Sequence, residues 1–229
     1  MKWRRDFNVD HIATTPQLPV ENFYSILKYY PHYLHGYAKD GCAVLYEVLG
    51  KADPKQLRKS GVTMDELVWH FVLRNEFALN VYQDPLQKQQ QQQQQDSVTK
   101  MMTVIDVEGI SVSSVTSEVI SFIKRSSDIV DNFYPQRVVR LVIVNSPRWF
   151  SSIWTVIARV LPEAVQKKID ILYDSAGLNK YIEMDQIPSN YGGAGVPLGQ
   201  AEGHKAFVKL AEDWNKQVLL SLQQHSVCH

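Results

Sequence analysis

Two apolar, β-branched runs flank an amphipathic segment in the middle of the chain. Residues 101–107 and 138–144 each have the length of a buried strand, and turn residues follow each run. Between them, apolar residues recur at helical spacing and give that segment one apolar face: Val115, Val119, Phe122, Ile123, Val130 and Phe133. A strand, a crossover helix and a second strand form a right-handed parallel unit. The pattern therefore predicts a parallel α/β core.

The first third of the chain predicts two helices and an antiparallel pair of strands. Residues 32–37 and 44–48 have strand character on either side of Asp40-Gly41, a hairpin turn signal because Gly tolerates positive φ. A short helix opens at Leu18-Pro19, and its expected buried stripe is Val20, Phe23, Tyr24 and Leu27.

A capping box marks the start of the second helix. Thr63 can accept from a backbone donor, and Glu66 can reach back to Thr63. We expect this helix to end near Asp84-Pro85, with one apolar side made of Leu67, Phe71, Ala78 and Tyr82. Seven glutamines follow at residues 89–95, and this polar tract predicts a mobile surface loop over residues 87–95.

The last third predicts a short aromatic helix, a third parallel strand and a long final helix. The first helix covers residues 149–161 and the strand residues 169–173, before a turn-rich segment at residues 187–193. The final helix begins near Glu202, and one side of it carries Phe207, Leu210, Ala211, Trp214, Val218 and Leu222.

Charge and composition narrow the possible partners. Lys plus Arg equals Asp plus Glu at 24 each, so there is no global basic field for nucleic acid, and we expect no nucleic-acid partner. Cys42 and Cys228 are far apart in a chain long enough to bury a core, which favours free thiols in a reducing compartment. The start lacks a signal-peptide pattern and no run is long and apolar enough to span a bilayer, so we expect a soluble protein.

Motifs that would carry catalysis or metal binding are weak. No phosphate loop and no G-x-S-x-G elbow occur. His32 and His35 would fall on opposite faces of a strand, which argues against a shared metal ion. Asp106 and Glu108 could imitate a carboxylate pair, but a strand-end Asp that accepts backbone hydrogen bonds is commoner. We therefore expect no enzyme activity, no metal and no cofactor.

Several short segments occur in an order and spacing that resemble a known family. They are Trp3-Arg4, residues 37–47, residues 103–113, Tyr134-Pro135-Gln136-Arg137, residues 141–147 with Trp149-Phe150, Lys168-Ile169 and residues 187–193. Together they resemble the CRAL-TRIO lipid-binding domain, and most of all its phosphatidylinositol-transfer-protein branch. The resemblance implies an α/β fold with a mixed, mainly parallel sheet flanked by helices around a hydrophobic lipid pocket.

The resemblance also implies a domain organisation. Residues 1–17 would be a remnant of the family's N-terminal helical lobe, residues 18–195 the lipid-binding domain, and residues 196–229 a C-terminal helical extension. Most of the N-terminal lobe lacks a counterpart, as expected of a fragment or a shortened product. Cys42-Ala43 replaces the usual Arg-Pro, and Gln136 replaces a Glu. The family's phosphatidylcholine pattern of Ser and Thr two positions apart reads Met101 and Thr103 here, which argues against a choline lipid.

Two sets of site residues follow from the resemblance. The first would bind the lipid headgroup and consists of Arg4, Thr103, Gln136, Arg137 and Lys168. An Arg can bind phosphate in a bidentate manner, a Lys adds a point charge, and Thr103 is a neutral donor. The second set would contact the membrane on a gating helix over residues 149–166, and consists of Trp149, Phe150 and Trp154. Packing of these aromatic side chains on the sheet is the alternative.

The implied function is binding of a phospholipid, phosphatidylinositol, in an internal pocket and its transfer or presentation between membranes. The bound phospholipid would be the ligand of a cytoplasmic monomer that touches membrane surfaces transiently. Two alternatives are open. The domain could sense a lipid and recruit a partner through its final helix, or it could carry another hydrophobic ligand such as a sterol-like, retinoid or tocopherol molecule.

Overall fold

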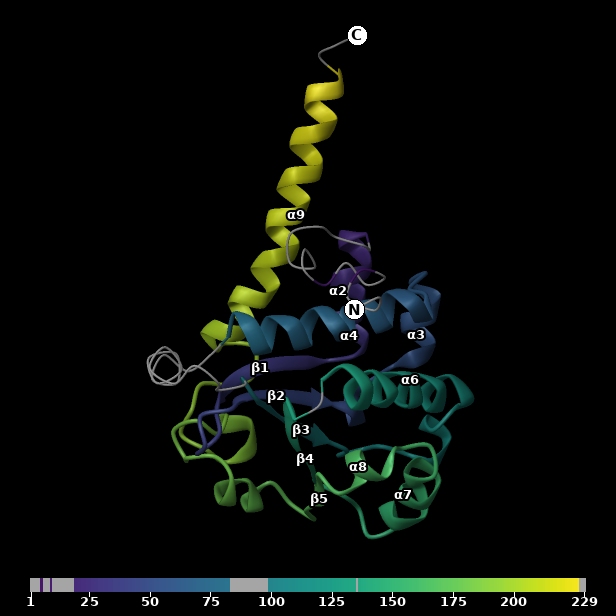
Figure 1. The fold of residues 1–229 in the computed structure, drawn as a ribbon, viewed down its shortest axis with the longest axis vertical. Helices are drawn as coiled ribbons and strands as arrows, with labels where there is room; N and C mark the ends of the chain where they lie inside the picture. The colour runs from purple at the N-terminus through teal and green to yellow at the C-terminus, as the bar shows by residue number, and fades with distance from the viewer. Residues whose placement is uncertain (1–4, 6–8, 10–18, 83–98, 135, 227–229) are drawn as a thin grey trace.

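The computed structural model describes residues 5, 9, 19–82, 99–134 and 136–226, with side chains of the last helix as far as residue 217. A five-stranded sheet lies at its centre (Figure 1). The strands follow one another in chain order: β1 (His32–Tyr37), β2 (Ala43–Val48), β3 (Met101–Asp106), β4 (Val138–Val144) and β5 (Ile169–Ile171). β1 pairs antiparallel with β2, and every other pair is parallel. The predicted mixed, mainly parallel sheet is confirmed.

Helices connect and flank these strands. The α-helices are α2 (Val20–Tyr29), α3 (Pro54–Lys59), α4 (Met64–Asn80), α6 (Ser117–Phe133), α7 (Phe150–Ala158), α8 (Glu163–Gln166) and α9 (Glu202–Ser226). Short 3-10 turns are η2 (Leu49–Lys51), η3 (Val112–Ser114), η4 (Ala176–Lys180) and η5 (Ser189–Tyr191). The β3, α6 and β4 elements form the predicted parallel unit, and Thr116 caps α6 by accepting from the Val119 amide.

The hairpin and the capping box are confirmed, but α4 differs from its prediction in two respects. Glu66 accepts from the Thr63 amide at 2.8 Å while Thr63 accepts from the Glu66 amide at 3.2 Å. The helix ends at Asn80, short of Asp84-Pro85. Every residue from Val68 to Leu79 is buried, rather than one side only. The helix packs against β2, α2 and α6 at once, so several faces meet protein.

The predicted stripe of α2 is wrong at one position. Phe23 and Ile26 are fully buried, whereas Tyr24 is 42% exposed. Phe23 fixes the orientation of the helix because its ring contacts His70 of α4 and both Phe207 and Trp214 of α9. Helical spacing alone does not say on which edge of the stripe the neighbouring helices lie.

Different parts of the chain pack on the two faces of the sheet. The successive side chains of β3 alternate, so that Met102 and Val104 join an apolar cluster with Leu178, Ile182 and other residues of the chain after β5. The opposite face carries Met101, Thr103, Ile105 and Val107, and lies under α3, α4, α6 and α7. α9 packs beside β1 and α2 and then extends away from the body (Figure 1).

Candidate functional site

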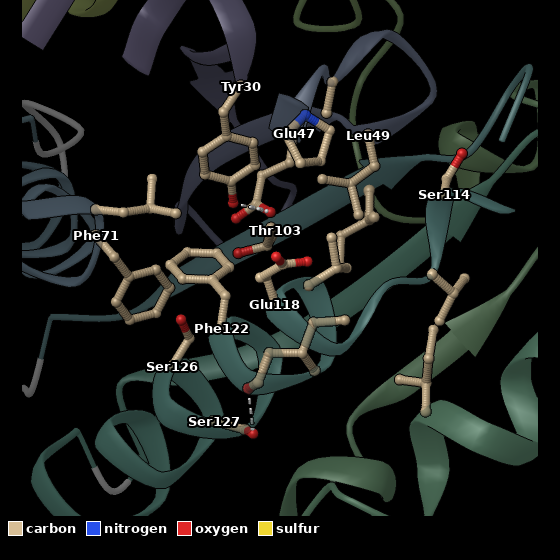
Figure 2. A pocket seen from close by; sticks show the side chains of 18 of the residues that line it. Tyr30, Glu47, Leu49, Phe71, Thr103, Ser114, Glu118, Phe122, Ser126 and Ser127 are labelled. Carbon is tan, nitrogen blue, oxygen red and sulfur yellow. Dashed lines mark hydrogen bonds between the residues drawn. The ribbon is translucent and has the colours of Figure 1, made fainter. Parts of the chain in front are cut away.

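A cavity of about 610 Å³ lies between the sheet and the helices that cover this face. Its volume is within the range of pockets that hold small ligands, about 300 to 1,000 Å³. Most of the lining is apolar and comes from elements that are distant in sequence, from Tyr29 at the end of α2 to Ile169 of β5 (Figure 2). The β3, α6 and β4 unit supplies both floor and wall.

The floor of the cavity comes from alternate residues of β3 and from β4. In β4, Val138, Leu141 and Ile143 line the cavity. The register between β3 and β4 shifts after Met101: Met101 pairs with Val138, whereas Met102 pairs with Arg140. Val139 is thus an extra, unpaired residue in β4. Because of it, the side chains of Leu141 and Ile143 point to the same side of the sheet as that of Val138.

The walls are aliphatic and aromatic. α6 contributes Val119, Phe122 and Ile123, and α7 contributes Trp154 and Ile157. Where the cavity meets solvent, its lining includes the exposed residues Lys55, Arg58 and Glu118. The guanidinium of Arg58 in α3 is paired with the carboxylate of Glu118 in α6 at 2.9 Å, so an ion pair joins two sides of the opening.

One end of the cavity is polar and deeply buried. The Tyr30 hydroxyl donates to Glu47 Oε2 at 2.7 Å, and Arg74 Nη1 donates to the Tyr30 hydroxyl at 3.2 Å. Arg74 Nη2 donates to Glu47 Oε1, which makes an ion pair in which Arg74 is 1% exposed. Thr103 and Ser126 line the same cavity (Figure 2).

The buried charges alter the acid–base properties of this end. Burial raises the pKa of the Tyr30 hydroxyl far above its ordinary value, so Tyr30 stays a hydrogen-bond donor. Desolvation by burial lowers the pKa of Arg74, but the charge of Glu47 and the hydrogen bonds that Arg74 donates to Tyr30 and Glu47 outweigh it and raise the pKa overall. Arg74 is therefore cationic at any ordinary pH.

The predicted headgroup residues do not come together in the cavity. Thr103 lines its floor and is 5% exposed, whereas Gln136, Arg137 and Lys168 are absent from the lining among the residues that the structure describes. Arg137 and Lys168 instead precede the neighbouring parallel strands β4 and β5, and Gln136 is an exposed turn residue with φ of 64°. Arg4 lies outside the described residues.

The predicted membrane-contact residues separate into two groups. Phe150 and Trp154 line the cavity, and Phe150 is only 3% exposed. Trp149 precedes α7 and is 41% exposed. The predicted helix over residues 149–166 consists of α7 and α8 with a turn between them. The polyglutamine segment lies outside the described residues.

Residues weighed for catalysis or metal binding have structural partners. Asp106 accepts from the Glu108 amide, Asn145 Nδ2 and the Tyr191 hydroxyl, each at 2.9 Å. His35 contacts Tyr46 on the side of the sheet away from the cavity, while His32 contacts His70 on the other side. Within the described residues, no group of three His, Cys, Asp or Glu could hold a metal ion, and no helix has the length and apolar character needed to cross a membrane.

Comparison with known proteins gives the family of this fold. The sequence profile of the CRAL/TRIO domain matches residues 27–193, which include every strand of the sheet and the whole cavity lining. The chain belongs to the CRAL/TRIO family. The family's profile thus ends before α9, at the turn that follows η5.

Individual relatives agree with this assignment. The chain is 32% identical over 200 residues to the SEC14 cytosolic factor of Schizosaccharomyces pombe, which covers 84% of this chain. It is 27% identical over 228 residues to the phosphatidylinositol/phosphatidylcholine transfer protein SFH13 of Arabidopsis thaliana, covering 98% of this chain and 35% of that protein. The chain spans 65% of the length of the S. pombe protein and of its Kluyveromyces lactis counterpart.

A solved structure supports the fold independently. The crystal structure of Sfh5 superposes with a TM-score of 0.66, covering 87% of this chain and 65% of that one, at 22% sequence identity. This likeness concerns the arrangement of helices and strands.

Proposed function

We propose that this CRAL/TRIO chain binds a phospholipid, phosphatidylinositol, in the cavity and transfers or presents it between membranes. The observation that carries the proposal is the cavity itself, which is lined by apolar side chains yet has an opening beside α3 and α6. The name of the SFH13 relative, a phosphatidylinositol/phosphatidylcholine transfer protein, points the same way. The activity would be binding and exchange without catalysis, by a cytoplasmic monomer that contacts membranes transiently.

The acyl chains supply affinity but little selectivity. Burial of each methylene from water yields about 0.8 kcal/mol, and the bilayer offers the same gain. Exchange between membrane and cavity is therefore nearly neutral for the chains, so polar contacts must select the lipid. The phosphate would be bound by Arg137 and Lys168, which immediately precede adjacent parallel strands, while Thr103 inside the cavity would be a neutral donor to the lipid.

A matched pair of variants tests the role of the cavity. Ile105 of β3 lines it, whereas Ile171 of β5 is 40% exposed and is not among its lining residues in the part of the chain described. Ile105→Trp should narrow the cavity from its floor and reduce transfer of labelled phosphatidylinositol between vesicles. Ile171→Trp makes the same chemical change and should transfer like the wild type. Equal transfer by both variants would contradict the proposal.

Carriage of another hydrophobic ligand is the second candidate, because Arg137 and Lys168 do not line the cavity as the structure describes it. The double variant Arg137→Ala/Lys168→Ala separates the two functions. Loss of phosphatidylinositol transfer with an unchanged unfolding transition would support the phospholipid. Unchanged transfer would show that neither Arg137 nor Lys168 contributes to ligand binding, and would favour a ligand that needs no contact to a phosphate.

A further inference from the structure

The buried end of the cavity already contains a cation of its own. The guanidinium carbon of Arg74 lies 4.8 Å from the ring centroid of Phe71 and 5.4 Å from that of Tyr30. Two aromatic rings and the carboxylate of Glu47 therefore surround Arg74 in an arrangement that proteins use to bind ligand cations. We call Tyr30, Phe71 and Glu47 the cation cage. A ligand cation would have to compete with a side chain that is tethered in place.

The charges of this end cancel. Five described lining residues carry charge, and three of them, Lys55, Arg58 and Glu118, are exposed at the opening. The buried two are Glu47 and Arg74, which form an ion pair. An anionic group here would meet the Glu47 carboxylate, and a cationic group would meet the Arg74 guanidinium. Because Glu47 and Arg74 neutralise each other, a charged ligand group would be buried at this end without a counter-ion, and an unpaired buried charge is costly.

Two polar atoms at this end still lack hydrogen-bond partners. Arg74 Nε and Ser126 Oγ are buried and have no partner in the described structure, and both residues line the cavity. Both residues are more than nine-tenths buried, Arg74 at 1% and Ser126 at 8% exposure. Figure 2 shows the Ser126 hydroxyl pointing from α6 toward the rings of Phe71 and Phe122. Buried polar atoms are almost always hydrogen-bonded, so a ligand atom that accepts from both would satisfy them.

We propose that the buried end of the cavity binds a neutral hydrogen-bonding group of the ligand, an ester carbonyl or a hydroxyl, through Arg74 Nε and Ser126 Oγ, and excludes a quaternary ammonium group. The inference rests on the proposed function in that it takes the cavity as a lipid site. In a phospholipid the neutral acceptor would be an acyl ester carbonyl, and the charged headgroup would lie elsewhere. Arg74 would thus disfavour burial of a choline headgroup at this end.

Three single-chain probes with the same tail isolate this end from phospholipid transfer. They are monopalmitoylglycerol, which is neutral, palmitoylcholine, which is cationic, and palmitate, which is anionic. The wild-type chain is incubated with an equimolar mixture below micellar concentrations, and bound probe is counted by native mass spectrometry. We expect monopalmitoylglycerol to exceed each charged probe by about tenfold, since a charged group would be buried without a counter-ion.

A charge cycle over Glu47 and Arg74 then tests the cause. Arg74→Met should shift the preference to palmitoylcholine, because the vacated cation cage keeps its carboxylate. Glu47→Gln should shift it to palmitate, and the double variant should restore monopalmitoylglycerol. Ser126→Ala should weaken monopalmitoylglycerol binding about fivefold, the value of one hydrogen bond.

The outcomes separate this inference from the proposed function. A wild-type chain that prefers palmitoylcholine or palmitate overturns the inference, as does a folded Arg74→Met chain that keeps the wild-type order. Should a single variant fail to fold because one buried charge is left unpaired, the wild type and the double variant still decide, since both must prefer the neutral probe. A chain that shows the expected probe order but moves no phosphatidylinositol between vesicles contradicts the proposed function alone.

Discussion

Lowering the pH from 7 to 5 should destabilise the fold through a pair of buried histidines. His32 and His70 are each 1% exposed, and their Nε2 atoms lie 3.0 Å apart. His32 Nδ1 also lies 2.7 Å from the Tyr30 carbonyl oxygen. The charged and titratable groups that act on the pair are Arg74 of α4 and His204 of α9. No carboxylate is among the groups that shift either histidine in the described structure, so a proton there would be unpaired.

The direction and size of the effect follow from the pKa shifts. Burial, with the charge of Arg74 added, lowers the pKa of His70 to about 3, and burial lowers that of His32 well below its usual value. In the unfolded chain both histidines would have a pKa of about 6.5. Below that pH the unfolded state binds protons that the folded state excludes, so the free energy of unfolding falls. Each histidine contributes about 1.4 kcal/mol per pH unit, or about 2 kcal/mol between pH 6.5 and 5.

Urea unfolding of the wild type and of His70→Gln between pH 7 and 5 measures the contribution of His70. The variant should be less stable at pH 7 but should lose about 2 kcal/mol less than the wild type on acidification. Burial also lowers the pKa of His35, and that of His204 to about 4, but these two contribute equally to both chains and cancel in the difference. Parallel pH profiles for the two proteins would refute the reasoning.

Three further predictions concern separate parts of the molecule. Thr63→Ala removes the capping box of α4 and should lower the free energy of unfolding by about 1 kcal/mol; an unchanged urea midpoint would contradict this. Asp106→Ala leaves the Tyr191 hydroxyl and the Asn145 amide without their acceptor and should cost at least about 2 kcal/mol by the same assay, whereas a loss near zero would argue against the network. Trp149→Ala should slow transfer between vesicles more than it lowers the melting temperature, because Trp149 is 41% exposed; reduced stability with unchanged transfer per folded molecule would exclude membrane contact.

The local sequence pattern is sufficient to predict the helices and strands that surround the site. The β4 strand occupies its predicted range, β3 ends one residue early at Asp106, and the capping box of α4 has the predicted hydrogen bonds. These features depend on residues close in sequence, such as Thr63 and Glu66, or on a periodicity that one segment carries by itself. The alternation of β3 likewise places Thr103 on the same face as Ile105.

The polar end of the cavity could not be predicted, because packing between distant elements creates it. Glu47 and Arg74 are 27 residues apart, on β2 and α4. The available signals were single charged residues in segments rich in apolar residues, Glu47 in β2 and Arg74 in α4. The burial of Arg74 follows from the full enclosure of α4, which a one-sided helical stripe does not anticipate. Similarly, the sequence places the basic residues Arg137 and Lys168 just before two strands, but chain position does not specify which way a long side chain extends, so it does not predict whether they line the cavity.

Native mass spectrometry after incubation with phosphatidylinositol vesicles tests the central claim most directly. The wild-type chain and Ile171→Trp should each carry one phosphatidylinositol molecule, and Ile105→Trp, whose new side chain narrows the cavity, should carry much less. A wild-type chain that remains free of lipid, or equal loading of Ile105→Trp, would contradict the account.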